Sequence, residues 1–170
     1  MLTAKRFFLS LFVIILLSLT SFARDDSAVR KETAKIKQLT KGADLILTGK
    51  VHKKVSGWND SKTRIYTKTT LQVEEVLKGQ KSDASVEVTS PGGEVDGIGE
   101  LYTHMPRFAD DEEVLVFLKK NEKDGNYRVV NGEEGKISIP VDSETEKKST
   151  GTKIQLDDLK AQIKRYTKDK

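Results

Sequence analysis

Six segments of the central part of the chain are predicted to form short β-strands, because apolar and polar residues alternate in most of them and one contains a continuous apolar run. Successive side chains of a strand point to opposite faces, so a period of two residues indicates one buried face. Turn residues such as Gly, Asn, Asp and Ser separate the segments. The segments span residues 43–58, 64–79, 84–90, 112–120, 126–132 and 135–140. This order predicts an all-β barrel or strongly coiled sheet and not a parallel α/β fold.

The first two segments are predicted to form a long hairpin. In the first segment the inward positions are Leu45, Leu47, Gly49, Val51 and Val55, and they alternate with Ile46, Thr48, Lys50, His52 and Lys54. In the second segment the residues that share one face are Ile65, Thr67, Thr69, Leu71 and Val73. Gly49 lies on the inward face, where a missing side chain permits a sharp bend or a bulge. A long, glycine-broken first strand paired with a second is typical of an OB-like barrel.

Two segments with helical features flank the strands. The segment 24–42 carries Ser27 as a candidate N-cap, Gly42 as a stop and a weak apolar stripe of Val29, Ile36 and Leu39. The segment 154–170 places Leu156, Leu159, Ile163 and Tyr166 at helical spacing, with acids near its start and bases near its end. The fold is therefore predicted to be mainly β: a small OB-like β-barrel of five to six strands with a short N-terminal helix and a C-terminal amphipathic helix.

The same patterns predict the boundaries of these parts. The barrel domain is expected over residues 43–140, and Pro140 ends its last strand at an edge. Within it, Val114 to Leu118 is apolar on both faces, which predicts a central strand covered on both sides. A polar linker is expected over 141–153, followed by the C-terminal helix, packed on the barrel.

The first 23 residues have the features of a secretory signal peptide. Lys5 and Arg6 precede the apolar run Phe7 to Leu19, and Ser21-Phe22-Ala23 is a small-x-small cleavage site. A membrane anchor is the alternative, but thirteen apolar residues are fewer than the roughly 20 that a spanning helix needs. Cleavage after Ala23 would send the protein to the periplasm or out of the cell, without a stable membrane anchor.

Composition limits the classes of partner and of chemistry. The chain has no cysteine, so disulfides and a lipid-bearing cysteine are excluded. Its 30 basic and 26 acidic residues are interspersed, and without Lys5 and Arg6 the mature chain has 28 basic residues against 26. Such a surface has no sustained basic stripe, and we expect no binding to nucleic acid.

The segment Ser90 to Phe108 is the main candidate for a functional surface. It is rich in glycine, and loops of this length are often functional. The structural alternative is a long barrel connection whose glycines take positive φ, with Met105, Pro106 and Phe108 packing back onto the core. A second candidate, Trp58, lies in the predicted turn 57–63 and would either make contacts with a partner or cap the barrel. The candidate binding surface comprises Trp58, Gly92, Gly93, Glu94, Asp96, Glu100, Tyr102, His104 and Arg107.

None of the recognised catalytic or metal-binding patterns is present. Glu94, Asp96 and Glu100 offer oxygen ligands, but their spacing does not match a calcium loop. With His52 and His104 as the only histidines and no cysteine, the sequence predicts no zinc site, and His52 is expected to face water. Ser90 is not in a G-x-S-x-G elbow. We therefore expect no catalytic residues, no metal and no cofactor.

Several segments together resemble a known family. They resemble exported bacterial proteins that are sometimes found near matrixin-like metalloproteases. The segments are ADLILTGKV, TTLQVEEVLKG, SPGGEVDGIG, MPRF, EEVLVFL and YRVVNGEEGKISI. The barrel of these exported proteins is similar to the OB-type domain of the tissue inhibitors of metalloproteinases (TIMP-like). The resemblance covers Ala43 to Ile139 and is most specific from Gly92 to Leu118. The family pattern prefers glycine where this chain has His104 and near Asp111, so we expect the turns there to differ.

The resemblance implies an exported barrel and does not carry an inhibitory mechanism. Metalloproteinase inhibitors chelate the catalytic zinc through an N-terminal cysteine, and this chain has none. The leading hypothesis is an exported, non-enzymatic binding or accessory module for an envelope protein, an extracellular protein or a small ligand. A protease-associated or protease-inhibiting domain and a hydrolase with an unrecognised site are the alternatives.

Overall fold

The computed structural model describes residues 26–80, 83–139 and 155–168. The predicted signal peptide and the predicted linker 141–153 lie outside the described residues. From Lys35 onward the described residues form one compact unit, and the residues before Lys35 belong to a second unit. The barrel, both pockets and the C-terminal helix all lie in the unit that begins at Lys35.

Eight strands are present among the described residues. They are β1 (Leu45–Trp58), β2 (Ile65–Lys78), β3 (Ser85–Pro91), β4 (Gly93–Val95), β5 (Ile98–Glu100), β6 (Glu113–Lys120), β7 (Tyr127–Val129) and β8 (Lys136–Ser138). The helices are α2 (Asp26–Gly42), the 3₁₀ turn η1 (Gly132–Gly135) and α3 (Leu156–Lys168). Each of the six predicted strand segments contains one strand.

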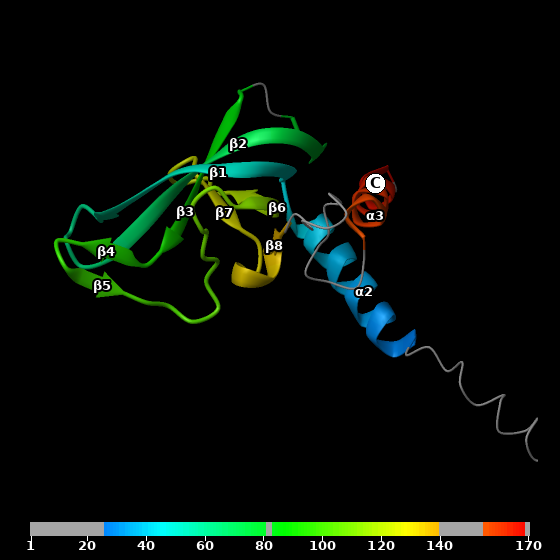
Figure 1. The fold of residues 1–170 in the computed structure, drawn as a ribbon, viewed down its shortest axis with the longest axis horizontal. Coiled ribbons are helices and arrows are strands. Elements are labelled where there is room, and N and C mark those ends of the chain that lie inside the picture. Colours follow the sequence, from blue (N-terminus) through cyan, green and yellow to red (C-terminus); the bar gives the residue numbers. More distant parts are fainter. Residues whose placement is uncertain (1–25, 81–82, 140–154, 169–170) are drawn as a thin grey trace, which may run out of the picture. The chain divides into compact units, whose positions relative to one another are not determined.

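Five of these strands close into a barrel. The order is β1, β2, β3, β7, β6, and β6 pairs with β1 again to complete the circle (Figure 1). The pair β3–β7 is parallel, and the other pairs are antiparallel. β8 adds an extra strand beside β6. The predicted mainly β, OB-like barrel of five to six strands with two helices is thereby confirmed.

β1 closes the barrel because it pairs along both edges at once. Its first half lies between β2 and β6, and its ladder with β2 shifts register between Thr48 and Gly49. A Cβ atom on Gly49 would collide with the backbone carbonyl of Gln72. The predicted bulge at Gly49 is therefore confirmed, and glycine is required there by the close approach of β2.

A further register shift in β1 overturns the predicted inward face beyond it. The shift lies between Val51 and Lys53 and leaves His52 without a partner in the ladder, exposed as expected. One extra residue moves every following side chain to the opposite face. Val55 was predicted to face inward and is instead 49% exposed. Lys54 was predicted to face outward and instead lies opposite Thr69 and lines a pocket at the barrel's end.

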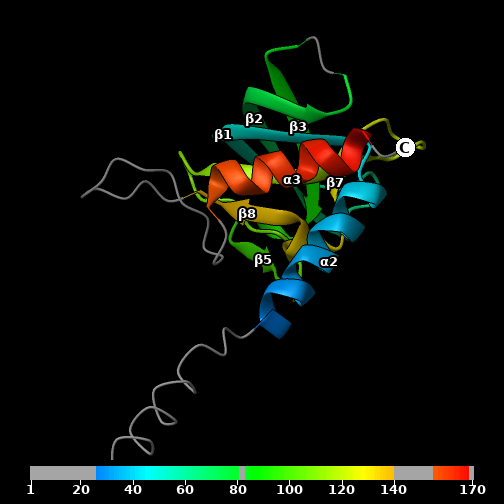
Figure 2. The same cartoon turned by 90° about the vertical axis from the view of Figure 1, so that its right-hand side faces the viewer.

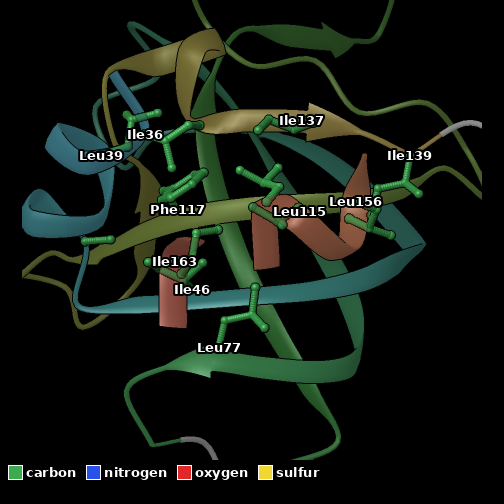
Figure 3. Packing of buried hydrophobic residues seen from close by; sticks show 12 residues of the cluster. Ile36, Leu39, Ile46, Leu77, Leu115, Phe117, Ile137, Ile139, Leu156 and Ile163 are labelled. Carbon is green, nitrogen blue, oxygen red and sulfur yellow. The ribbon is translucent and has the colours of Figure 1, made fainter. Parts of the chain in front are cut away.

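Two apolar clusters form the core. One fills the barrel and includes Leu47, Val51, Leu71, Val88 and Val116. The other lies on the outer face of β1, β6 and β8, where residues of the helices cover it; Figure 3 shows Ile46, Leu115, Phe117 and Ile137 facing Leu39, Leu156 and Ile163. The run Val114 to Leu118 is fully buried because alternate residues contribute to the two clusters. Its predicted central position is confirmed.

The C-terminal helix packs as its apolar spacing predicts. Leu156, Leu159 and Ile163 are buried, and α3 lies across the strands (Figure 2). Lys160 and Lys164 on α3 form ion pairs of 2.8 and 2.7 Å with Glu75 on β2. The hydrogen bonds from these lysines hold the pKa of Glu75 below its usual value.

The N-terminal helix differs slightly from its prediction. α2 begins at Asp26, so Ser27 lies in the first turn, and Gly42 is its last residue. Val29 is exposed, which reduces the apolar stripe to Ile36 and Leu39. At the C-terminal end of the helix, the Lys78 ammonium donates hydrogen bonds to the carbonyls of Thr40 and Ala43. A cation at this end stabilises the helix dipole. No helix in the described part of the chain is long and apolar enough to cross a membrane.

The close approach at Gly49 makes a testable prediction. Gly49→Ala should lower the free energy of unfolding by about 1–3 kcal/mol, the usual effect of overpacking. Gly57→Ala is the matched control, because an added Cβ there meets no atom within 4 Å, and it should change stability by less than about 0.5 kcal/mol. Urea unfolding followed by the fluorescence of Trp58, the only tryptophan, measures both. Equal losses in the two variants would contradict the proposed role of Gly49.

Candidate functional site

The segment Ser90 to Phe108 is more ordered than the loop that the sequence predicts. It contains the hairpin β4–β5, beside the ends of β1 and β2 that meet in the Asn59–Arg64 turn (Figure 1). Asp96 and Gly97 form its two-residue turn, both with positive φ. Asp-Gly is a preferred sequence for such turns. Asp96, predicted as a candidate binding residue, therefore lies in a turn that lines neither pocket described below.

Two glycines let the chain cross the end of the barrel. Gly92 and Gly93 have φ values of 98° and 136°, which only glycine adopts readily. An added Cβ on Gly92 would lie 2.9 Å from the carbonyl oxygen of Glu100, and one on Gly93 would collide with the hydroxyls of Ser56 and Thr67. The expectation that glycines of this segment take positive φ is confirmed at Gly92, Gly93 and Gly97. Both crossing glycines shape the wall of a pocket instead of contributing side chains to it.

A hydrogen-bond chain ties the segment to the start of β2. The Arg64 guanidinium donates to the Tyr102 hydroxyl at 2.5 Å, and that hydroxyl donates to the Glu100 carboxylate at 2.9 Å. The same carboxylate accepts the backbone N–H of Ile65 at 3.1 Å. The hydrogen bond with Tyr102 raises the pKa of Arg64. Glu100 and Tyr102 thus hold the hairpin in place, through the Tyr102 hydroxyl and one carboxylate oxygen of Glu100.

A cavity of about 530 Å³, which we call the barrel-end pocket, lies between this segment and the barrel. Its walls come from β1, β2, β3, the β4–β5 hairpin and residues 101–108. A volume of this size is within the range of small-molecule and side-chain binding sites.

The barrel side of the pocket is polar. Thr67 donates its hydroxyl proton to the carbonyl of Gly92 at 2.7 Å, so Ser56, 2.9 Å away, donates to Thr67. The Lys54 ammonium donates to the carbonyl of Phe108 at 3.0 Å and pairs with Asp110 at 3.1 Å. These groups are satisfied within the protein and form a preorganised wall.

Ser90 is the exception on this wall. It is 6% exposed, it lines the pocket, and its hydroxyl has no hydrogen-bond partner among the described residues. Leaving a buried hydroxyl unpaired costs about 1–3 kcal/mol. The hydroxyls of Thr48 and Thr89 are also unpartnered within the described chain, but neither residue lines the pocket. Ser90 therefore combines an unmet hydrogen-bonding capacity with a position beside a cavity.

Part of the exposed pocket lining is apolar. Leu101 is 74% exposed and Met105 is 36% exposed, and both line the pocket. Ile98, on the neighbouring strand β5, is 54% exposed. Large exposed apolar side chains in or near a cavity are typical of interaction sites.

A smaller cavity of about 370 Å³ lies on the other side of residues 102–107. His104 lines it and pairs with Glu133 at 3.2 Å, an exposed contact that contributes little stability. Arg107 lines both cavities and has no partner within the described residues. His104 and Asp111 both have positive φ, 61° and 58°, a conformation that glycine takes most readily.

A half-buried ion pair fixes the end of the segment. Lys136 on β8 contacts Glu112 at 2.6 Å, with side chains 12% and 16% exposed. Burial by itself raises the pKa of Glu112, but hydrogen bonds from Lys136, Ser138 and the Ala109 N–H outweigh it and hold the pKa below its usual value. The Lys136 ammonium also lies 5.3 Å from the centre of the Phe108 ring, a favourable cation–π distance. Phe108 is thereby held in the pocket wall.

The structure brings together only part of the predicted binding surface. The predicted residues that line the barrel-end pocket are Gly92, Gly93, Glu94, Glu100, Tyr102 and Arg107. His104 lines the smaller cavity only, and Trp58, half-buried at the end of β1, lines neither. Trp58 is thus less buried than a cap on the barrel would be and less exposed than a free contact residue would be.

The polar wall of Lys54, Ser56, Thr67 and Thr69 is not predicted from the sequence. A signal for two of these residues was present, because Thr67 and Thr69 occupy inward positions between Ile65 and Leu71, where apolar residues are usual. No comparable signal marked Lys54 and Ser56, since the bulge at His52 determines their direction.

Within residues 26–80, 83–139 and 155–168, no group of three or more histidine, aspartate or glutamate side chains is placed to hold a metal ion. No model of a known protein family matches the chain, and no curated protein matches its sequence.

The Glu112 ion pair predicts a pH-dependent contribution to stability. Glu112→Gln should lower the free energy of unfolding at pH 7 by about 1–3 kcal/mol, because it leaves Lys136 half-buried without its counter-charge. The folded-state pKa lies below the unfolded value of about 4.3, so this stabilisation is complete above that pH and is lost as the pH falls through the folded pKa. Urea unfolding at pH 7 and pH 3 should show the difference between the two proteins shrinking in acid. An equal difference at both pH values would contradict this role.

Proposed function

We propose that this protein is an exported, non-enzymatic binding module whose ligand occupies the barrel-end pocket. The observation that carries the proposal is the Ser90 hydroxyl, buried and unpartnered within the described residues beside a cavity of about 530 Å³. A bound donor or acceptor would satisfy this hydroxyl. The exposed lining residues Leu101 and Met105 would bury apolar surface on the same ligand.

The state of the polar groups supports binding in place of catalysis. Neither histidine lines the pocket, and the hydroxyls of Ser56 and Thr67 are committed to each other and to a backbone carbonyl. The Lys54 ammonium is engaged with Asp110 and with the carbonyl of Phe108. A nucleophile needs a base within hydrogen-bond reach, and Ser90 has no such partner in the described chain.

The export part of the proposal rests on the leader-like residues 1–23. A basic start, an apolar run and a small-x-small site are the features that direct secretion. The ligand would then be met in the periplasm or outside the cell. It would be a small ligand or a segment of an envelope or extracellular protein.

Filling the pocket tests the proposal. Gly99 lines the pocket on β5, has no positive φ, and an added Cβ there would come no closer than 4.0 Å to its neighbours. Gly99→Leu should therefore fold normally and obstruct the pocket. Gly57→Leu is the matched control, because Gly57 is equally open and lies outside the pocket lining.

The measurement is a thermal-shift screen with a library of metabolites, oligosaccharides and short peptides. Compounds that raise the Tm of the wild type should act equally on Gly57→Leu and lose their effect on Gly99→Leu. Compounds that stabilise Gly99→Leu as strongly as the wild type would show that binding occurs elsewhere.

Ser90→Ala should separate stability from binding. Removing an unpaired buried hydroxyl should leave the free energy of unfolding unchanged or raise it by up to about 1 kcal/mol, and ligand affinity should fall about fivefold or more. Thr89→Val is the control, because it removes the neighbouring unpartnered hydroxyl, which lies outside the pocket lining. Urea unfolding and titration calorimetry with a compound from the screen measure the two quantities. An unchanged affinity in Ser90→Ala would argue against a role of this hydroxyl in binding.

A further inference from the structure

The strand β5 presents an open edge beside the barrel-end pocket. In the described part of the chain, β5 pairs only with β4, and the ladder joins Val95 to Ile98, Glu94 to Gly99 and Gly93 to Glu100. In a hairpin with a two-residue turn, the pair that flanks the turn, here Val95 and Ile98, is hydrogen-bonded. The next pair, Glu94 and Gly99, is therefore a non-hydrogen-bonded pair. The N–H and C=O of Gly99 therefore point away from β4, toward the open edge. Such groups are a template for another extended chain.

Apolar side chains accompany this edge. Three of the five large apolar residues that are exposed in the described chain belong to this region: Ile98, Leu101 and Met105. The edge also lacks the lysine or proline with which proteins often block pairing, since β5 reads Ile-Gly-Glu. An open strand edge with exposed apolar neighbours fits an extended polypeptide.

The pocket is less well suited to a sugar ring. Sugars stack on open aromatic faces, but the Tyr102 ring lies against the Arg64 guanidinium at 5.8 Å, and Phe108 is 7% exposed. Trp58 lies outside the pocket lining. An aromatic platform is thus lacking among the described residues that line the pocket.

The charges of the pocket also argue against a small anion or cation. Its charged lining residues are Lys54, Arg107, Glu94 and Glu100, two of each sign. Lys54 is neutralised by Asp110, and Glu100 already accepts two hydrogen bonds. A ligand with many polar groups and no net charge, such as a peptide backbone, matches this balance.

We infer that the ligand is an extended peptide segment that adds as a strand to the open edge of β5 and inserts one side chain into the barrel-end pocket. This inference rests on the proposed function of that pocket. The Gly99 N–H and C=O pair with the backbone of the peptide. Apolar side chains of the peptide lie on Ile98 and Leu101. The inserted side chain has an apolar body, which contacts Met105, and a hydrogen-bonding end, which pairs with Ser90. Tyrosine has this chemistry.

Selection of peptides tests the inference. A random twelve-residue phage library is panned on the purified protein, and selected peptides are synthesised and titrated by calorimetry. Bound peptides should be rich in apolar residues and contain a tyrosine. Their affinity should fall at least tenfold with Gly99→Leu and stay unchanged with Gly57→Leu.

Backbone methylation tests strand addition itself. Peptides are N-methylated at alternate residues in two sets, one for each edge of the peptide strand. The set facing β5 should weaken binding at least tenfold, and the other set should be tolerated, because only one edge of an added strand pairs with the sheet. Equal tolerance of both sets would overturn strand addition.

A double-mutant cycle tests the inserted side chain. Tyrosine to phenylalanine in the peptide should weaken binding to the wild type about fivefold and leave binding to Ser90→Ala unchanged. Equal effects on both proteins would overturn the contact with Ser90. If no peptide binds but another compound loses its thermal shift in Gly99→Leu, the peptide inference fails and the proposed function stands. If nothing that binds is sensitive to Gly99→Leu, both fail.

Discussion

Closure of the barrel depends on one strand that pairs along both of its edges. β1 must follow β2 on one side and β6 on the other over residues 45–50, and it must then bend to follow β2 alone. The bend needs a position where the neighbouring backbone can approach closely, and Gly49 provides it beside the carbonyl of Gln72. The two apolar clusters lie on the two sides of the sheet so formed. Helix packing outside the barrel and the filling of its interior therefore both follow from this strand.

The irregularity of β1 at His52 determines which side chains line the candidate site. By displacing His52 from the ladder, the chain turns Lys54 and Ser56 toward Thr69 and Thr67. The barrel interior consequently changes from apolar, at Val51 and Leu71, to polar at one end. Such a change weakens the core locally, because hydroxyls in place of methyl groups must find partners. Ser90 has no such partner in the described chain, so its proposed binding role comes at a cost in stability.

Much of the fold could be predicted because it depends on short-range patterns. The six strand segments, the buried run Val114 to Leu118 and the spacing of Leu156, Leu159 and Ile163 follow from periodicity that each segment carries by itself. The hairpin β4–β5 was missed, because strands of three residues are too short for a period to emerge, although Asp96-Gly97 is a recognisable turn sequence. The polar wall was missed for a different reason. A bulge has no reliable local sequence signal, and one extra residue reverses which side chains face inward.

The sequence by itself determined the class of the fold, the absence of disulfides and the segment in which a site should be sought. These properties depend on composition and on the alternation of apolar and polar residues, and both can be read from residues that are close together in the chain. Only the tertiary structure decided which residues of that segment line a cavity and which hold the framework. Glu100 and Tyr102 are engaged with Arg64 and the Ile65 N–H, whereas Ser90 lines the pocket and its buried hydroxyl has no partner in the described chain. That distinction depends on contacts between residues far apart in the chain, which form only when the barrel closes.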